Sequence, residues 1–276
     1  MTRQNLIPVD LSPAPAEAAA SAGDQNGTNG KTEEDASKLP SGPSPVLIPL
    51  WDMANHVNGV ITTGYNEPEA RVESLTLKDY RKGEQIFIHY GQRTNADFLV
   101  HNGFVFPDNA NSDITIQLSL STNDELYEIR KALLEKLNLP SANGEFTVCR
   151  KPEPISRQLL GFARVFNMTK DQLAHWTALE KAELGKLLLP DESPFDQELR
   201  EKVWKFLTIR LQLAIRMTGT TLEQDEALLA GQNQKGSQKL SHIRAMLVQY
   251  RVVEKKILHE VLDFCQEQLA AKDKKE

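Results

Sequence analysis

The stretch that decides the fold reads Leu50-Trp-Asp-Met-Ala-Asn-His56, and it is followed after two further strand-like runs by Ile88-His-Tyr-Gly91. Each piece alone has an ordinary structural interpretation. A histidine after an apolar run is usually a hydrogen-bonded structural residue, and Tyr90 before Gly91 can simply end a strand before a turn. The order and the context of the two pieces are more informative than either piece alone.

The composition limits the class of protein. A chain of 276 residues suggests one or two domains, and a hydrophobic fraction of 40% is low for one compact globule. The net charge of −6 argues against a nucleic-acid-binding surface, which usually shows as an excess of basic residues. Cys149 and Cys265 lie far apart and outside any C-x-x-C spacing, so we expect neither structural zinc nor a disulfide framework.

Two features would indicate a membrane or secreted protein: a bilayer-spanning apolar run and an apolar signal core. No apolar run reaches the length that spans a bilayer, and the start Met1-Thr-Arg-Gln-Asn5 has no apolar signal core. We therefore expect a soluble, monomeric protein of the cytoplasm that binds no membrane. Entry into the nucleus is left open, because no basic cluster favours active import.

The first third of the chain divides by composition. Residues 11–45 are rich in Ala, Ser, Gly, Pro, Asn and acidic residues, which predicts a disordered insertion. Residues 46–106 read as a small strand-rich unit. Strands are expected over 46–50, 59–63, 71–77 and 85–90, and a short helix capped by Thr94 or Asn95 is expected to end at Gly103.

The remainder of the chain is mostly helical by its periodicity. After one strand over 113–118, helices are expected from Asn123 or Asp124 to Leu137, over 154–166, from Thr169, from about Pro194 and over 240–269. This half carries no recognisable catalytic constellation. Its basic residues Lys239, Arg244, Arg251, Lys255 and Lys256 are interpreted as a solvated face, or alternatively as part of a docking groove.

The two decisive stretches resemble the SET-domain methyltransferase family. That family carries an Asn-His pair after a short apolar strand and a Tyr-Gly pair further on, and the two segments thread into a knot-like active site. The matching residues here are Asn55, His56, Tyr90 and Gly91.

The resemblance narrows to the actin-histidine N-methyltransferase branch. It is carried by four stretches: Met1-Thr-Arg-Gln-Asn-Leu-Ile-Pro8, Trp51-Asp-Met-Ala-Asn-His56, Asn58-Gly-Val-Ile-Thr-Thr-Gly-Tyr-Asn66 and His89-Tyr-Gly-Gln-Arg-Thr-Asn-Ala-Asp-Phe98. The C-terminal half resembles the helical substrate-binding domain of the Rubisco large-subunit methyltransferase group.

The resemblance implies an α+β fold in which a partial β-rich SET domain is followed by an all-helical substrate-binding domain. The expected divisions are 1–10 (the end of an insert within the SET domain), 11–45 (the disordered insertion), 46–106 (the C-terminal part of the SET domain) and 107–272 (the helical domain).

The resemblance also implies a cofactor and residue roles. The cofactor would be S-adenosylmethionine, held by Asn55, His56 and Phe104, with Tyr90 beside the transferring methyl group. Asn5 would fix the tautomer of the accepting imidazole. The substrate contacts would be Arg3, Gln4, Ile48, Trp51 and Arg93.

Each of the less distinctive residues can also be explained without a role in binding or catalysis. Core packing is as good an explanation of Trp51 and Phe104, and an arginine such as Arg93 is more often a solvated charge. Asn102 stands where the family often has a small hydroxyl residue.

Two alternatives remain beside a protein-histidine methyltransferase acting on actin. One is a non-catalytic module that binds actin or another protein, and the other is a protein-lysine methyltransferase with the same fold. The SET family carries a G-x-G cofactor loop and several strands upstream of the Asn-His pair, and these 276 residues contain neither. We therefore expect this chain to be inactive by itself.

Overall fold

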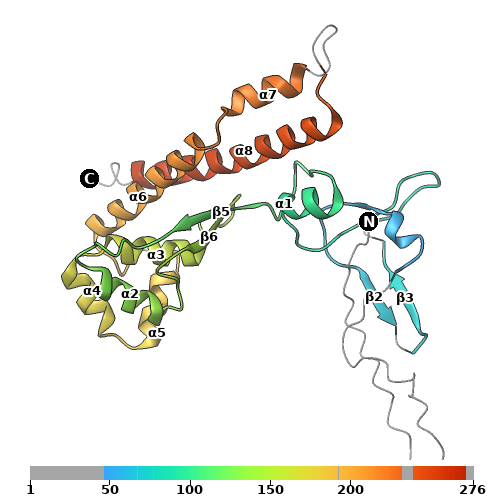
Figure 1. Ribbon diagram of the computed structural model, residues 1–276. Coiled ribbons are helices and arrows are strands. Elements are labelled where there is room, and N and C mark those ends of the chain that lie inside the picture. The colour runs from blue at the N-terminus through green and yellow to red at the C-terminus, as the bar shows by residue number, and fades with distance from the viewer. Residues whose placement is uncertain (1–46, 67, 77, 192, 232–238, 272–276) are drawn as a thin grey trace, which may run out of the picture. The chain divides into compact units, whose positions relative to one another are not determined.

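The computed structural model describes residues 47–271 except 67, 77, 192 and 232–238 (Figure 1). The expectations for Arg3, Gln4 and Asn5 and for the insertion at 11–45 lie outside the described residues. The chain divides into two compact units, Met1–Gly91 and Gln92–Glu276. The sequence places the domain change later, after residue 106.

The N-terminal unit is built from short elements. They are η1 (Trp51–Met53), β1 (Asn55–His56), β2 (Thr63–Asn66), β3 (Arg71–Ser74) and β4 (Phe87–Ile88). Strands β2 and β3 form an antiparallel hairpin, whereas β1 and β4 pair in parallel. The hairpin is labelled in Figure 1.

None of the four strands expected in this unit has the expected extent. Over residues 47–50 the expected strand is wrong: the chain turns at Pro49 and Leu50 and continues into η1. Leu50 adopts a φ of 66°, in the left-handed region that strands do not use. The strand expected over 59–63 begins only at Thr63, and β3 starts at the expected Arg71 but ends at Ser74. Of the strand expected over 85–90, only Phe87–Ile88 forms, as β4.

The C-terminal unit contains the remaining elements. They are α1 (Asn95–Asp97), the π-helical turn η2 (Phe98–Asn102), β5 (Asp113–Leu118), α2 (Tyr127–Lys136), β6 (Gly144–Cys149), α3 (Arg157–Asn167), α4 (Lys170–Thr177), α5 (Lys181–Leu184), η3 (Gly185–Leu188), α6 (Gln197–Arg216), α7 (Leu222–Gly231) and α8 (His242–Ala270).

The expectation of an all-helical domain is wrong in one respect. Strand β5, predicted over the same residues, pairs antiparallel with β6 along six residues, from Asp113 opposite Cys149 to Leu118 opposite Gly144. The alternation of buried Phe146 and exposed neighbours in β6 is a strand signal that the sequence reading missed.

Capping residues explain where most of the helices begin and end. Thr169 caps α4 through a capping box with Gln172, as predicted. Asn138, which follows α2, has a φ of 55° and stops that helix. Helices α3 and α6 begin later than expected, because Ser156 and Asp196 are the caps that accept from the first-turn amides. Beneath the helices lies one continuous apolar core.

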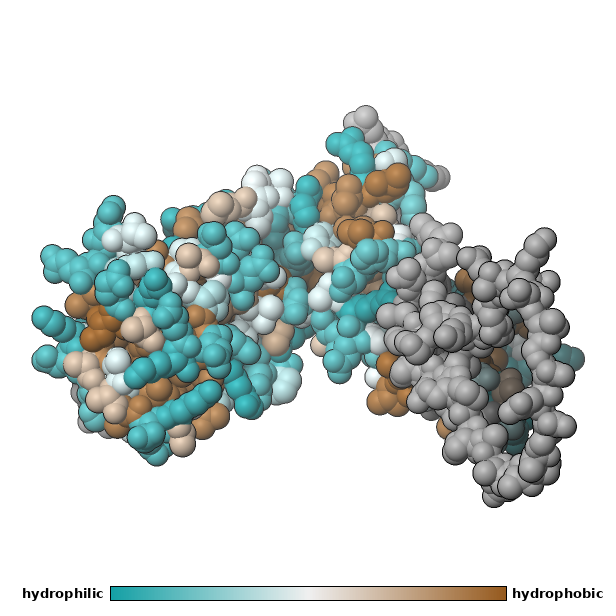
Figure 2. Space-filling model, turned by 60° about the horizontal axis from the view of Figure 1, so that its bottom comes forward, coloured by the Kyte–Doolittle hydropathy of each residue, from teal (hydrophilic) through white to brown (hydrophobic). Residues whose placement is uncertain are grey.

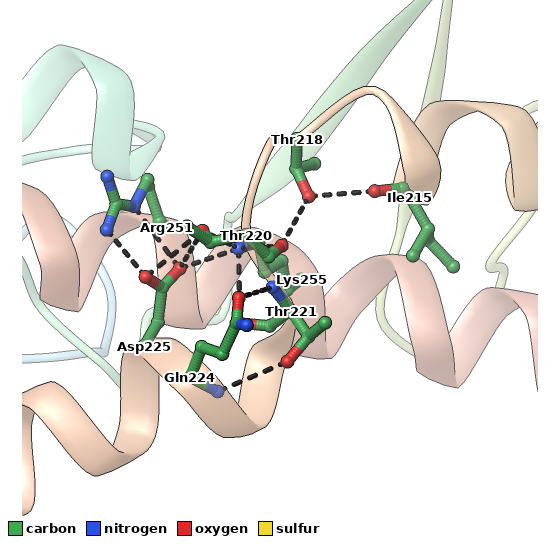
Figure 3. A network of polar contacts seen from close by, with 8 residues as sticks. All are labelled: Ile215, Thr218, Thr220, Thr221, Gln224, Asp225, Arg251 and Lys255. Carbon is green, nitrogen blue, oxygen red and sulfur yellow. Dashed lines mark hydrogen bonds and ion pairs between the residues drawn. The ribbon is translucent and has the colours of Figure 1, made fainter.

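A buried polar network holds the turn between α6 and α7 against α8 (Figure 3). Lys255 is 1% exposed, so its interpretation as part of a solvated face is wrong. Its Nζ donates to the Thr220 carbonyl at 2.6 Å, the Thr220 hydroxyl at 2.7 Å and the fully buried Asp225 carboxylate at 2.6 Å. Arg251 donates to both oxygens of the same carboxylate, at 2.5 and 3.2 Å. These contacts join the turn between α6 and α7 to α8.

The surface is mixed in character. In the view of Figure 2, apolar patches lie among hydrophilic residues rather than forming one continuous face. Within the residues that the structure describes, no helix has the length and apolar character needed to cross a membrane.

Candidate active site

The parallel pairing of β1 with β4 brings the two decisive stretches of sequence together. Asn55 lies opposite Phe87, His56 lies opposite Ile88, and the Val57 amide donates to the Ile88 carbonyl at 3.1 Å. Successive side chains of a strand point to opposite faces, so His56 is buried while Asn55 is exposed. The pairing therefore aligns the Asn-His pair with the segment that leads directly into Tyr90.

Tyr90 is fixed at both ends by residues of the Asn-His segment. Its hydroxyl donates to the Ala54 carbonyl at 2.5 Å, and its amide donates to Nδ1 of His56 at 3.2 Å. The ring centroids of His56 and Tyr90 lie 5.2 Å apart. Because Nδ1 accepts, the neutral imidazole of His56 carries its proton on Nε2.

His89 completes this arrangement and was missed by the sequence reading. Its Nδ1 donates to the Val57 carbonyl at 3.1 Å, and its ring centroid lies 5.4 Å from that of His56. Its position between the strand and Tyr90 was visible in the sequence. Its partner could not be found there, because that carbonyl lies 32 residues away and is reached only through the parallel pairing.

Gly91 allows the chain to leave the site sharply. Its φ of 92° lies in the region that L-amino acids with a side chain avoid. A Cβ at this position would meet no atom within 4 Å, so the requirement for glycine comes from the backbone and not from crowding. The Tyr-Gly pair is therefore explained by a turn that must follow a fixed tyrosine.

Trp51 lines an apolar hollow of about 480 Å³ in the N-terminal unit. Its indole Nε1 donates to the Thr63 hydroxyl at 2.9 Å, which ties η1 to the β2–β3 hairpin. The other residues that line the hollow are Leu50, Met53, Ala54, Ser74, Leu75, Thr76, Gln85, Ile86, Phe87 and Ile88. Ile48, the second expected pocket wall, is partly buried and is not among them.

Arg93 belongs to the C-terminal unit and is held in place by hydrogen bonds. Its Nη1 donates to Oδ1 of Asn102 at 3.3 Å, and its carbonyl accepts from the Asn109 amide group at 2.8 Å. Asn102, whose role the sequence left open, therefore orients the guanidinium. The interpretation of Arg93 as a merely solvated charge does not fit these contacts.

Phe104 follows Gly103, whose φ of 73° ends the π-helical turn η2 as predicted for that glycine. The ring of Phe104 stacks on the fully buried Phe98 at a centroid distance of 4.8 Å, with 21° between the ring planes. Phe104 itself is half-buried. Phe104 can therefore pack on the core with one face of its ring and cover a ligand with the other.

The segment that carries Arg93 and Phe104 is anchored by Asn95, which sequence reasoning considered only as a cap. The Asn95 side chain is 3% exposed, donates to the Phe106 carbonyl at 3.0 Å and to the Ser112 hydroxyl at 2.9 Å, and accepts from the Phe106 amide at 2.9 Å. Thr94 is the actual cap and forms a capping box with Asp97. Burial, and then the nearby Asp97 carboxylate, raise the pKa of Asp113 in the same region.

The residues present fit a cofactor with a sulfonium methyl group and an amino-acid end. The exposed Asn55 side-chain amide offers two N–H donors and a carbonyl acceptor. The Tyr90 hydroxyl has committed its proton to the Ala54 carbonyl, so its oxygen presents only lone pairs to a neighbouring group. Such an oxygen suits a methyl group that carries partial positive charge. Within the described part of the chain, no cluster of His, Cys, Asp and Glu could hold a metal ion.

Comparison with known proteins places the C-terminal unit in a family. Residues 121–258 match the family described as Rubisco LSMT substrate-binding. The chain belongs to this family. The match covers α2 to the middle of α8 and therefore includes the buried network around Lys255.

Relatives match the chain over both units. An actin-histidine N-methyltransferase of Danio rerio is 40% identical over 218 residues, which are 78% of this chain and 35% of that protein. One of Homo sapiens is 37% identical over 264 residues, which are 95% of this chain and 38% of that protein. The chain thus spans little more than a third of the length of these curated relatives.

Solved structures show the same fold. The structure of Rubisco LSMT bound to AdoMet superposes with a TM-score of 0.61 at 22% identity, over 83% of this chain and 52% of that chain. The SET domain of LSMT bound to lysine and AdoHcy gives a TM-score of 0.60 over 82% of this chain. The mixed α+β architecture expected from the sequence is therefore confirmed.

Proposed function

We propose that this chain is the C-terminal part of an S-adenosylmethionine-dependent protein N-methyltransferase that methylates a histidine of actin. One structural observation carries the proposal: the β1–β4 pairing holds the Tyr90 hydroxyl on the Ala54 carbonyl, next to Asn55 and His56. The relatives that match both units support the histidine and actin assignments, since each is an actin-histidine N-methyltransferase.

The cofactor would supply an electrophilic methyl group, and the residues of this chain would hold and orient the reactants. Asn55 and the backbone of His56 would bind the cofactor, and Phe104 would cover its adenine. The Tyr90 oxygen, fixed by Ala54, would lie beside the methyl group and favour an in-line approach. Trp51, with its indole tied to Thr63, would present a rigid wall to a flat ring.

The accepting group would be a neutral imidazole. A free histidine has a pKa of about 6.5, so most of it is already unprotonated at cellular pH and needs no strong base. The tautomer still has to be fixed so that one nitrogen presents its lone pair. By resemblance, Asn5 would accept from the other nitrogen, with Gln4 and Arg3 contacting the substrate together with Ile48 and Arg93.

The finer fold assignment belongs to the same proposal. Residues 46–106 would be the end of a SET domain, and residues 107–272 would form the domain that docks the protein substrate. An enzyme with this substrate would act in the cytoplasm, as a monomer.

The decisive experiment measures transfer of labelled methyl from S-adenosylmethionine to purified actin, followed by mass spectrometry of the modified residue. The enzyme would be tested as the 276-residue chain and as a fusion to the upstream residues of the Danio rerio relative. We expect label on a histidine with the fusion, lost in Tyr90→Phe and in Asn5→Ala. Tyr65→Phe, on β2, is the matched control.

Two results would contradict the proposal. Label on a lysine would mean that the enzyme is a lysine methyltransferase with the same fold. An inactive fusion, measured beside the active relative, would leave this chain a binding module without catalytic capacity.

A further inference from the structure

Helix α6 has an apolar stripe on the side that faces away from the core. Its inner side is buried through residues spaced four apart, including Val203, Leu207 and Leu211. Ile209 and Leu213 each follow a buried leucine by two residues and therefore lie on the opposite side of the helix. They are 63% and 47% exposed. Met217, the next residue at the same spacing, is 79% exposed.

The first half of the same outer face shows what a solvated surface looks like on this helix. There Lys202 pairs with Glu198 at 2.6 Å, and Lys205 pairs with Glu201 at 3.2 Å. These i,i+4 pairs are typical of a helix face that meets water. The face then changes character within one turn, because after Lys205 its central positions become Ile209, Leu213 and Met217. A helix segment that is apolar on two opposite sides is normally covered on both.

The charged residues along this part of the helix indicate which kind of partner would bind to the stripe. From Lys205 to Met217 the chain contains three basic residues and no carboxylate. Arg210 lies 5.2 Å from the centroid of the Phe206 ring, and Arg216 is exposed to solvent. The helix dipole favours cations at this end, but it does not account for exposed apolar side chains between them.

A second feature adjoins the end of the stripe. Arg216 also lines a hollow of about 480 Å³ whose other walls include Thr221, Glu223 and His259. Lys255, which donates to the Thr220 carbonyl in the turn after Met217 (Figure 3), also lines this hollow. The stripe and the hollow therefore meet at Arg216 and Met217, and the residues named for both belong to the C-terminal unit.

We propose that the stripe Ile209–Leu213–Met217 is the docking surface for an acidic amphipathic helix of the protein substrate. The spacing of four matches the ridges with which two helices most commonly pack. Carboxylates flanking the apolar side of the incoming helix would pair with Arg210 and Arg216. This inference rests on the proposed function, because it identifies the partner as the protein that is methylated.

The test compares whole actin with a short peptide that carries the accepting histidine and no docking helix. Ile209→Asp and Arg216→Glu are introduced into the fusion enzyme. We expect the KM for actin to rise about tenfold in each, as for a contact at the centre of an interface, while kcat and methylation of the peptide stay unchanged.

Ile243→Asp is the matched control, because Ile243 is also a 63% exposed isoleucine but lies on α8. It should change the KM for actin less than twofold. Unchanged actin kinetics in Ile209→Asp would overturn the proposal, as would an equal loss in Ile243→Asp. A dimer that Ile209→Asp dissociates would show that a second copy covers the stripe instead.

Failure of the docking proposal is distinguishable from failure of the proposed function. If the unsubstituted fusion methylates neither actin nor the peptide, the proposed activity is wrong, and the docking proposal that rests on it is wrong as well. If it methylates both and Ile209→Asp does the same, only the docking surface is wrong.

Discussion

Replacing Lys255 with methionine tests whether the buried network stabilises the C-terminal unit. The substitution keeps most of the side-chain volume but removes the charge that lies 2.6 Å from the fully buried Asp225 carboxylate. Removing one partner of a buried ion pair costs about 3–5 kcal/mol. Arg251 still donates two hydrogen bonds to this carboxylate, so we expect the lower end, about 3 kcal/mol.

The assay is urea unfolding of the 276-residue chain, followed by far-ultraviolet circular dichroism. The midpoint should fall while the slope stays constant, because the folded unit buries the same surface. Arg251→Met is the control: Arg251 is 40% exposed, and its loss should cost about 1 kcal/mol. The double variant Lys255→Met, Asp225→Leu should recover most of the loss, because it leaves no buried charge unpaired.

A loss below about 1 kcal/mol in Lys255→Met would refute this reasoning. It would mean that water or Arg251 alone compensates the carboxylate, so that the network would not be what holds the turn between α6 and α7. A double variant that is less stable than Lys255→Met would refute the assignment of the cost to the stranded Asp225.

Burial raises the pKa of Asp225, but hydrogen bonds from Lys255, Arg251 and Thr220 hold it below its ordinary value. Its contribution to stability is therefore present above about pH 4, and acid titration should show it lost as pH falls through the folded pKa. Gly91→Ala should destabilise the N-terminal unit by about 1–2 kcal/mol, measured as faster proteolysis, while Gly64→Ala, without a positive φ, should not. Thr169→Ala should cost about 1 kcal/mol in urea unfolding. Burial raises the pKa of Cys265 to about 12, so at pH 8 its thiol should react with Ellman's reagent only after denaturation.

The elements that the sequence predicted well are those whose signals are local. Thr169 and Gly103 act through their own backbone neighbourhood, and each ends or begins a helix where expected. The expected strand before Trp51 failed, because its apolar run is indistinguishable by composition from a turn that exposes the same residues. Leu50, at 87% exposed, shows that apolar character did not predict burial there.

The candidate site divides in the same way. The pairing of Asn55 and His56 with Phe87 and Ile88 is a long-range contact, and only the resemblance to a known family anticipated it. The role of Asn102 as the partner of Arg93 and the burial of Lys255 were not predictable, because each depends on an atom that folding brings near. A charged residue on an amphipathic helix gives no sign in sequence of whether it meets water or a carboxylate.

The parallel ladder between β1 and β4 also has an engineering consequence. The segment over residues 57–86 is a long loop whose two ends are held together by the pairing of β1 with β4. Within it, strands β2 and β3 pair with each other. The entropy of closing such a loop grows only slowly with its length. The turn that joins β2 to β3 is therefore a place where an epitope tag or a fluorescent reporter could be spliced into the chain without altering the spacing of Asn55 and Tyr90.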